Sequence, residues 1–288
     1  MKLQYFAPLL LCLFALRTSA VEPPTVVLRD LADAPREAQG EWIALAEHAD
    51  LFLPEGEGAE AGSTATLTFH FHGASWWAAE EHLRRGARNP LVTFGGMQGS
   101  SAYRVPFEGT TLFEDLITSA SAAMDRPVGP VELQSFSAGY GAIREILKTP
   151  EYVDRVEAVV LADSLYASFA VEGGGDDRAP AAHQMAPFIA FAEKAARGEK
   201  LMVVAFCEIF TPDYASTVDT ARALVQAMDG RFEQVEPGSI PAADPKLANP
   251  LKFRFDQRGL HVWGYGGDDA NAHMAMARTL AGYWRAVE

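Results

Sequence analysis

The stretch that most constrains the fold runs from Val131 to Gly141 and reads VELQSFSAGYG. It begins as a short alternating strand, turns on small residues and continues into a helix-like sequence. A serine at a sharp strand-to-helix turn is pushed out at the edge of a sheet, where the N-terminus of the following helix faces any oxyanion. The residues two before and two after that serine must be small, because the turn is crowded. Ser137 meets this condition with Ser135 and Gly139, so we interpret it as the nucleophile of an elbow.

Residues 1–20 have the pattern of a cleavable signal peptide. Lys2 gives a basic start, residues 6–16 are almost wholly apolar, and Thr18, Ser19 and Ala20 supply the small residues of a cleavage site. The apolar run is too short to span a bilayer comfortably. We therefore expect a secreted or periplasmic protein that keeps no stable membrane insertion after cleavage.

The net charge restricts the classes of binding partner, and the cysteine content decides whether a disulfide can form. The chain has 38 acidic and 24 basic residues, a formal net charge of −14, which disfavours nucleic acid and anionic lipid as partners. Cys12 lies in the signal peptide, so Cys207 alone remains after cleavage and no intramolecular disulfide can form. We expect a small-molecule or peptide substrate and no nucleic-acid partner; the oligomeric state stays open.

Strands and helices alternate over most of the chain. Residues 21–45 form an N-terminal arm or linker, and 46–288 form one domain that opens with an antiparallel hairpin of strands 49–54 and 65–72. Buried strands are predicted at 90–94, 131–136, 155–163 and 200–206, with helices at 77–85, 111–123, 184–197, 216–228 and 270–286. This order predicts an α/β fold in which helices cover both faces of a mostly parallel sheet.

Candidate functional groups fall at the carboxyl ends of these strands. Ligands of parallel sheets bind at that edge, where His72, Ser137, Asp163 and the 264–269 loop all lie. A serine needs an imidazole to take its proton and a carboxylate to hold that imidazole. His273 follows the last strand and is the predicted base. The competing His261 lies within a strand and is expected to be packed.

Two regions compete for the acid. Asp163 ends the strand that follows the elbow helix, and a carboxylate at the end of so apolar a strand needs a specific partner. Glu208 or Asp213, after the next strand, would also reach the site, although Asp213 could instead cap the helix near Ser216. We favour Asp163, and each choice gives the chain order serine, acid, histidine.

The combination SxSAGY, DSLY, His72-Gly73 and a histidine after the last strand resembles the α/β-hydrolase superfamily, and within it a poorly characterised exported bacterial branch. The resemblance covers about Asp50 to the C-terminus. It implies a three-layer α/β-hydrolase-type sandwich, an oxyanion hole made by the N–H groups of Ala138 and Ala74, and no cofactor. Ser135 departs from the more common glycine of the elbow.

Other interpretations of single features stay open. His70 and His72 are spaced like metal ligands, but the aspartate and histidine of a metallohydrolase pattern do not follow. Four aromatic residues near the candidate groups could line a cleft or belong to the core: Trp76, Trp77, Tyr140 and Tyr166. The sequence thus predicts an exported serine hydrolase that cleaves an ester or amide through an acyl-enzyme, with no metal. A catalytically inactive, α/β-hydrolase-like binding protein of the cell envelope is the alternative.

Overall fold

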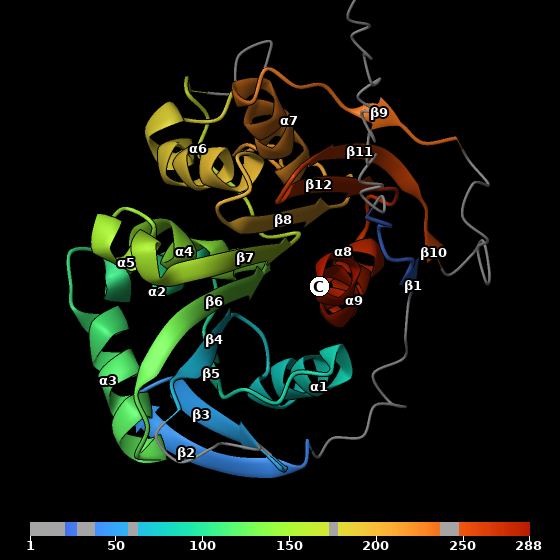
Figure 1. The fold of residues 1–288 in the computed structure, drawn as a ribbon. Coiled ribbons are helices and arrows are strands. Elements are labelled where there is room, and N and C mark those ends of the chain that lie inside the picture. The colour runs from blue at the N-terminus through green and yellow to red at the C-terminus, as the bar shows by residue number, and fades with distance from the viewer. Residues whose placement is uncertain (1–20, 28–37, 57–62, 173–177, 237–247) are drawn as a thin grey trace, which may run out of the picture.

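A computed structural model describes residues 21–27, 38–56, 63–172, 178–236 and 248–288 (Figure 1). The predicted signal peptide lies outside the described residues. None of the helices in the described ranges is both long and apolar enough to cross a bilayer.

A ten-stranded sheet forms the centre of the molecule. Its strands run in the order β2 (Gly40–Ala46), β3 (Ala49–Pro54), β5 (Leu91–Phe94), β4 (Ala65–Phe71), β6 (Val128–Phe136), β7 (Val156–Ala162), β8 (Leu201–Phe206), β12 (Leu260–Tyr265), β11 (Leu251–Gln257) and β9 (Glu233–Gln234). The six central strands of this order, β5, β4, β6, β7, β8 and β12, are mutually parallel. The outer strands β2, β3, β11 and β9 pair antiparallel with their neighbours. A separate pair joins β1 (Val26–Val27) to β10 (Ala248–Asn249).

Helices cover both faces of the sheet (Figure 1). One face carries α2 (Ser100–Arg104), α3 (Leu112–Met124), α4 (Tyr140–Ile146), α5 (Pro150–Arg155), α6 (Ala182–Ala196) and α7 (Thr217–Ala227), with the 3-10 turns η2 (Val105–Phe107) and η3 (Ser137–Gly139). The other carries α1 (Ser75–Arg85), α8 (Ala270–Ala277) and α9 (Leu280–Val287). The predicted three-layer α/β sandwich with a mostly parallel sheet is confirmed.

The two cores follow from strand periodicity. Successive side chains of a strand point to opposite faces of the sheet. In β7, Val159 and Leu161 therefore join the core under α3 to α7, while Val160 and Ala162 join the core under α1, α8 and α9. A strand buried on both faces reads as a continuous apolar run, which is why the sequence located β7 and β8 well.

The N-terminal hairpin exists, but the predicted pairing of its strands is wrong. Strand β3 pairs with β2 through the short turn at Glu47 and His48, and β5 lies between β3 and β4. A two-residue connection strongly favours a hairpin, whereas the long acidic connector before β4 leaves its strand free to pair elsewhere. Strand β2 lies largely within the predicted arm of residues 21–45, and none of its residues is fully buried.

The predicted final helix is divided in two. Helix α8 ends at Ala277 and α9 begins at Leu280, with Arg278 and Thr279 between them. The Thr279 hydroxyl donates to the Ala275 carbonyl, 2.9 Å away. Such a bond back to the preceding turn often bends a helix.

Two histidines, His70 and His82, are buried in the fold. His70 Nε2 lies 2.7 Å from the His72 carbonyl and His82 Nε2 lies 2.8 Å from the Asn89 carbonyl, so these nitrogens carry the proton. Each Nδ1 is buried without a partner. Burial lowers the pKa of both side chains to about 4. Both imidazoles are therefore neutral in the folded protein near neutral pH.

We expect the free energy of unfolding to fall as the pH drops from 7 to 5. The unfolded chain takes up protons on these histidines near their usual pKa of about 6.5, whereas the folded chain does not until about pH 4. The stabilisation is complete above pH 6.5 and is lost on approaching pH 4, at about 2 kcal/mol for each histidine by pH 5. Urea unfolding at both pH values measures it. His82→Gln should remove about half of the loss, and a stability independent of pH over this range would contradict the assignment.

Candidate active site

Ser137 sits at a strained turn between β6 and the η3–α4 segment. Its φ is +48°, in the left-handed region that a residue with a Cβ seldom adopts. Such strain persists only where the surroundings hold it, and it is often found at functional sites. The turn presents the Ser137 side chain to a cavity of about 940 Å³ at the carboxyl edge of the sheet.

The two small residues that flank Ser137 in the elbow, Ser135 and Gly139, are each held by their surroundings. A Cβ on Gly139 would lie 2.2 Å from the Phe71 carbonyl oxygen, so only glycine fits there. Ser164 donates to the Ser137 carbonyl at 2.8 Å, which leaves Ser135 as donor in its 2.7 Å bond to the Ser164 hydroxyl. Ser135 is therefore small, as the turn requires, and also ties the elbow to the segment after β7.

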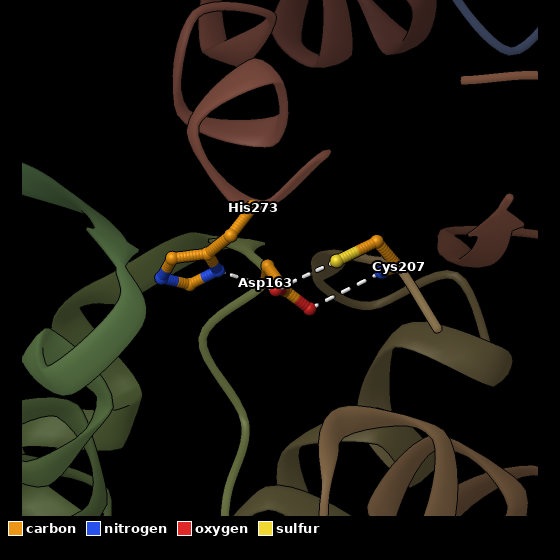
Figure 2. A group of neighbouring side chains, drawn as sticks. All are labelled: Asp163, Cys207 and His273. Atoms are coloured by element: carbon orange, nitrogen blue, oxygen red, sulfur yellow. Dashed lines mark hydrogen bonds and ion pairs between the residues drawn. The ribbon is translucent and has the colours of Figure 1, made fainter. Parts of the chain in front are cut away.

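The acid and the histidine are joined, as Figure 2 shows. His273 Nδ1 lies 2.5 Å from Asp163 Oδ2, although the two residues are 110 positions apart. Asp163 follows β7 directly, has a φ of +44° and is fully buried. The His273 ring packs on Phe136 with ring centroids 4.5 Å apart, and its Nε2 lies on the side away from Asp163. His273 lines the same cavity as Ser137.

Three further groups donate hydrogen bonds to Asp163. The Thr217 hydroxyl lies 2.6 Å from Oδ1, the Cys207 N–H lies 3.2 Å from Oδ1, and the Cys207 thiol lies 3.0 Å from Oδ2. Burial, and next the charge of Asp163, raises the pKa of the Cys207 thiol far above its usual value, so the thiol stays protonated and can donate. A buried carboxylate with donors on both oxygens is held in one orientation.

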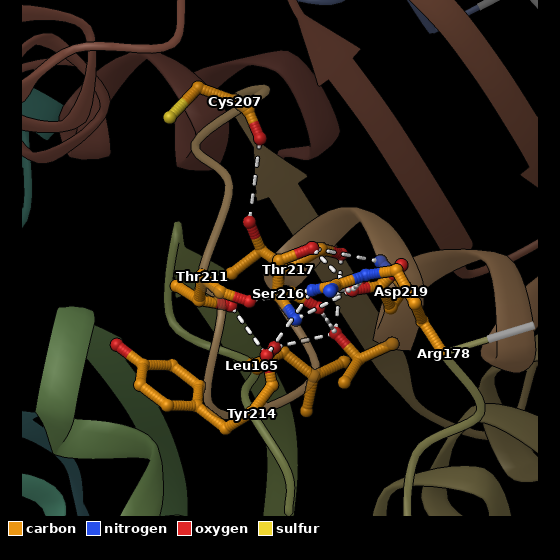
Figure 3. A network of polar contacts seen from close by, with 9 residues as sticks. Leu165, Arg178, Cys207, Thr211, Tyr214, Ser216, Thr217 and Asp219 are labelled. Carbon is orange, nitrogen blue, oxygen red and sulfur yellow. Dashed lines mark hydrogen bonds and ion pairs between the residues drawn. The ribbon is translucent and has the colours of Figure 1, made fainter. Parts of the chain in front are cut away.

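Thr217 owes its position to the start of α7 (Figure 3). Ser216 caps this helix and forms a capping box with Asp219. Thr217 is the first helical residue, so the N-terminal end of the α7 dipole also lies beside Asp163 and favours its negative charge. Ser216 and Asp219 thus fill the capping role that the sequence could have given to Asp213.

The alternative acids lie elsewhere. Glu208 is paired with Lys252 at 2.6 Å, and Asp213 is exposed. His261 is buried in β12 and lies 2.6 Å from Asp256, so it is packed as predicted. Of the predicted oxyanion donors, Ala138 lines the cavity, whereas the exposed Ala74 does not.

The metal-like spacing of His70 and His72 does not bring their imidazoles together. His70 is buried and bonded to the His72 carbonyl, while His72 leaves β4 with a φ of +71° and places Nδ1 3.0 Å from the Tyr103 hydroxyl. Within the described ranges, the grouping of metal-ligand types is Asp163, Cys207 and His273, whose atoms already bond one another.

The four aromatic candidates divide between core and cavity. Trp77 is buried in the core under α1 and Trp76 packs against it, whereas Tyr140 and Tyr166 line the cavity. Sequence reasoning missed Cys207, Thr217 and Tyr214. The rule that ligands gather at the carboxyl ends of strands could have found Cys207, which directly follows β8. Thr217 and Tyr214 carried no pattern of their own.

The strand order, with β5 inserted before β4, together with the elbow after β6, defines the α/β-hydrolase fold. No family model and no curated protein sequence matches the chain.

Several solved structures are distantly similar. A ferulic acid esterase is 13% identical with a TM-score of 0.47, over 87% of this chain and 100% of that one. An acetyl xylan esterase from Aspergillus awamori is 10% identical with a TM-score of 0.45, over 84% of this chain and 98% of that one. A carboxylesterase from Bacillus subtilis is 9% identical with a TM-score of 0.42, over 85% and 90%.

Proposed function

We propose that this protein is an exported serine hydrolase that cleaves an ester or amide bond through an acyl-enzyme intermediate. Ser137 attacks the carbonyl carbon, His273 is the base and then the acid, and Asp163 orients the imidazole. The N–H of Ala138, which lines the cavity, holds the oxyanion, and the N–H of Ala74 at the start of α1 is the proposed second donor although Ala74 itself lies outside the cavity lining. The observation that carries the proposal is the Asp163–His273 hydrogen bond beside the cavity that Ser137 also lines.

The proposed proton transfers follow from the hydrogen bond that His273 donates to Asp163. With Nδ1 donating to Asp163, the neutral imidazole of His273 has its lone pair on Nε2, where it can accept the Ser137 proton. The serine oxygen then adds to the carbonyl, and the imidazolium returns its proton to the leaving group. Water repeats the cycle on the acyl-enzyme. Thr217 and Cys207 act as positioning residues, because they hold the carboxylate that holds the imidazole.

The location and partners form part of the same proposal. Residues 1–20 would direct export, which places the enzyme in the periplasm or outside the cell, acting on a small molecule or peptide without nucleic acid or membrane insertion. An inactive binding protein of the cell envelope is the less supported function. Such a protein has no need for a strained serine beside a histidine–carboxylate pair.

A fluorophosphonate probe tests the proposal. It should label the wild-type protein at a single site, which peptide mass spectrometry should locate at Ser137, and wild type should release p-nitrophenol from p-nitrophenyl acetate. Labelling that is absent, or that persists unchanged in Ser137→Ala, would refute the proposal. Loss of turnover on adding a chelator would instead favour a metal-dependent hydrolase.

A further inference from the structure

The cavity beside Ser137 is poor in aliphatic side chains. Among the described residues that line it, Ile209 alone has a branched aliphatic side chain. The rest of the wall is tyrosine, small residues and polar or charged groups. Each methylene of an acyl chain that enters an apolar wall would raise kcat/KM about fourfold. This wall offers a long alkyl chain little of that gain.

Three tyrosines form a continuous row along the cavity. The rings of Tyr140 and Tyr166 have centroids 5.6 Å apart, and those of Tyr166 and Tyr214 are edge-to-face at 5.7 Å. Tyr140 lies three residues after Ser137, and Tyr166 lies three residues after Asp163. These two residues of the row therefore lie close along the chain to the proposed nucleophile and acid, and the row lines the same cavity as Ser137.

The hydroxyls of this row are available to a ligand. Within the described part of the chain, neither the Tyr166 nor the Tyr214 hydroxyl forms a hydrogen bond. Burial raises the pKa of both phenols, so both stay protonated and can donate. Tyr166 is 9% exposed and Tyr214 is 44% exposed, so the second ring lies at the open end of the row and both hydroxyls can donate to a ligand.

The network at the start of α7 holds Tyr214 in place (Figure 3). The carbonyl of Tyr214 accepts bonds from the Thr211 hydroxyl at 2.6 Å and from Arg178 at 3.4 Å. Arg178 is itself anchored by Asp219 at 3.1 Å. In Figure 3 the Tyr214 ring points away from this network. The fold thus fixes the backbone of Tyr214 and leaves its hydroxyl to the cavity.

Another part of the cavity wall is polar and equally ordered. The Gln184 side chain accepts from Arg144 at 3.0 Å and from the Ser168 N–H at 2.9 Å, and donates to the Ser168 hydroxyl at 3.1 Å. The Arg144 guanidinium also lies 5.5 Å from the Tyr140 ring centroid. These contacts fix the polar groups of this wall before any ligand arrives.

We infer that the substrate carries a hydroxyl-bearing ring next to its scissile bond, and that the Tyr140–Tyr166–Tyr214 row binds this ring. Such a ring packs a face on tyrosine while its hydroxyls bond the phenols and the polar wall. A sugar in the alcohol part and a phenol in the acyl part share this chemistry. The inference rests on the proposed function and specifies the substrate class of the same site.

Two matched ester pairs test it. Methyl 6-O-acetyl-glucopyranoside is compared with cyclohexylmethyl acetate, and methyl 3-(4-hydroxyphenyl)propanoate with methyl 3-phenylpropanoate. We expect the hydroxylated ester to have at least about a tenfold higher kcat/KM in one pair. A preference in the first pair places the ring in the alcohol part, and one in the second places it in the acyl part. No preference in either pair, or rates that rise about fourfold per methylene from p-nitrophenyl acetate to octanoate, would overturn the inference.

Phenylalanine variants test the role of the row. Tyr166→Phe and Tyr214→Phe keep the ring and remove the hydroxyl, so the preference for the hydroxylated ester should fall about tenfold. Tyr152→Phe is the matched control, because Tyr152 packs on Phe113 outside the cavity, and it should keep the wild-type preference. A wild-type preference in both cavity variants would overturn the assignment of the row.

Different results would refute the proposed function and the proposed substrate class. Absence of fluorophosphonate labelling and of all ester turnover refutes the proposed function itself. Normal labelling and turnover without a preference for the hydroxylated ester refutes only the substrate class.

Discussion

Replacing Ser137 or His273 with alanine should lower kcat/KM for ester hydrolysis by about 10⁴-fold or more, because each removal abolishes the acyl-enzyme route. The two losses should not add in the double variant, since the residues act as one unit. Alanine fits the backbone at position 137 no worse than serine does, so the variant should keep its fold. Initial rates with p-nitrophenyl acetate and a circular dichroism spectrum of each variant measure these effects.

A matched control separates this loss from damage to the fold. Ser119 is a half-buried serine on α3 outside the cavity, and Ser119→Ala should keep wild-type rates. Turnover within a few-fold of wild type in both Ser137→Ala and His273→Ala would defeat the assignment of these residues.

Asp163→Asn should lower kcat/KM by about 10³- to 10⁴-fold. An amide supplies N–H groups where Thr217, Cys207 and His273 now donate, so donors would face donors and the imidazole would lose its tautomer. The buried mismatch should also lower the free energy of unfolding by about 1–3 kcal/mol. Steady-state kinetics and urea unfolding on the same samples separate the two effects.

The rival acids serve as controls for that variant. Glu208→Gln and Asp213→Asn should stay within a few-fold of wild type, because one carboxylate is paired with Lys252 and the other is exposed. Thr217→Val should cause an intermediate loss in kcat, and Thr217→Ser, which keeps the hydroxyl, should restore it. A loss confined to the Glu208 or Asp213 variant would identify a different acid.

Strand positions and strand ends could be read from the sequence. The continuous apolar runs of β7 and β8 have no other stable place than a sheet buried on both faces. The small residues around Ser137 reflect a steric limit, visible in the 2.2 Å that would separate a Cβ on Gly139 from the Phe71 carbonyl oxygen. Asp163 was predicted to have a partner because an unpaired buried carboxylate is costly, and it has four donors.

The pairing of the strands and the tertiary contacts at the site could not be predicted from sequence patterns. The period of a strand shows which residues share a face but not which strand lies beside it, so β5 between β3 and β4 was missed. Thr217 and Tyr214 sit in ordinary surroundings along the chain and meet Asp163 or the cavity only through folding. The split of the last helix occurs at Arg278 and Thr279, and the Thr279 hydroxyl bond to the Ala275 carbonyl that accompanies it is not signalled by any periodicity.

A crystal structure of the fluorophosphonate adduct tests the central claim most directly. We expect phosphorus bonded to Ser137 Oγ, the His273 Nε2 roughly 3 Å from that oxygen, and the Ala138 N–H within hydrogen-bond distance of the phosphoryl oxygen. Phosphorus on any other residue, or an imidazole of His273 turned away from Ser137 and separated from Asp163, would contradict the account.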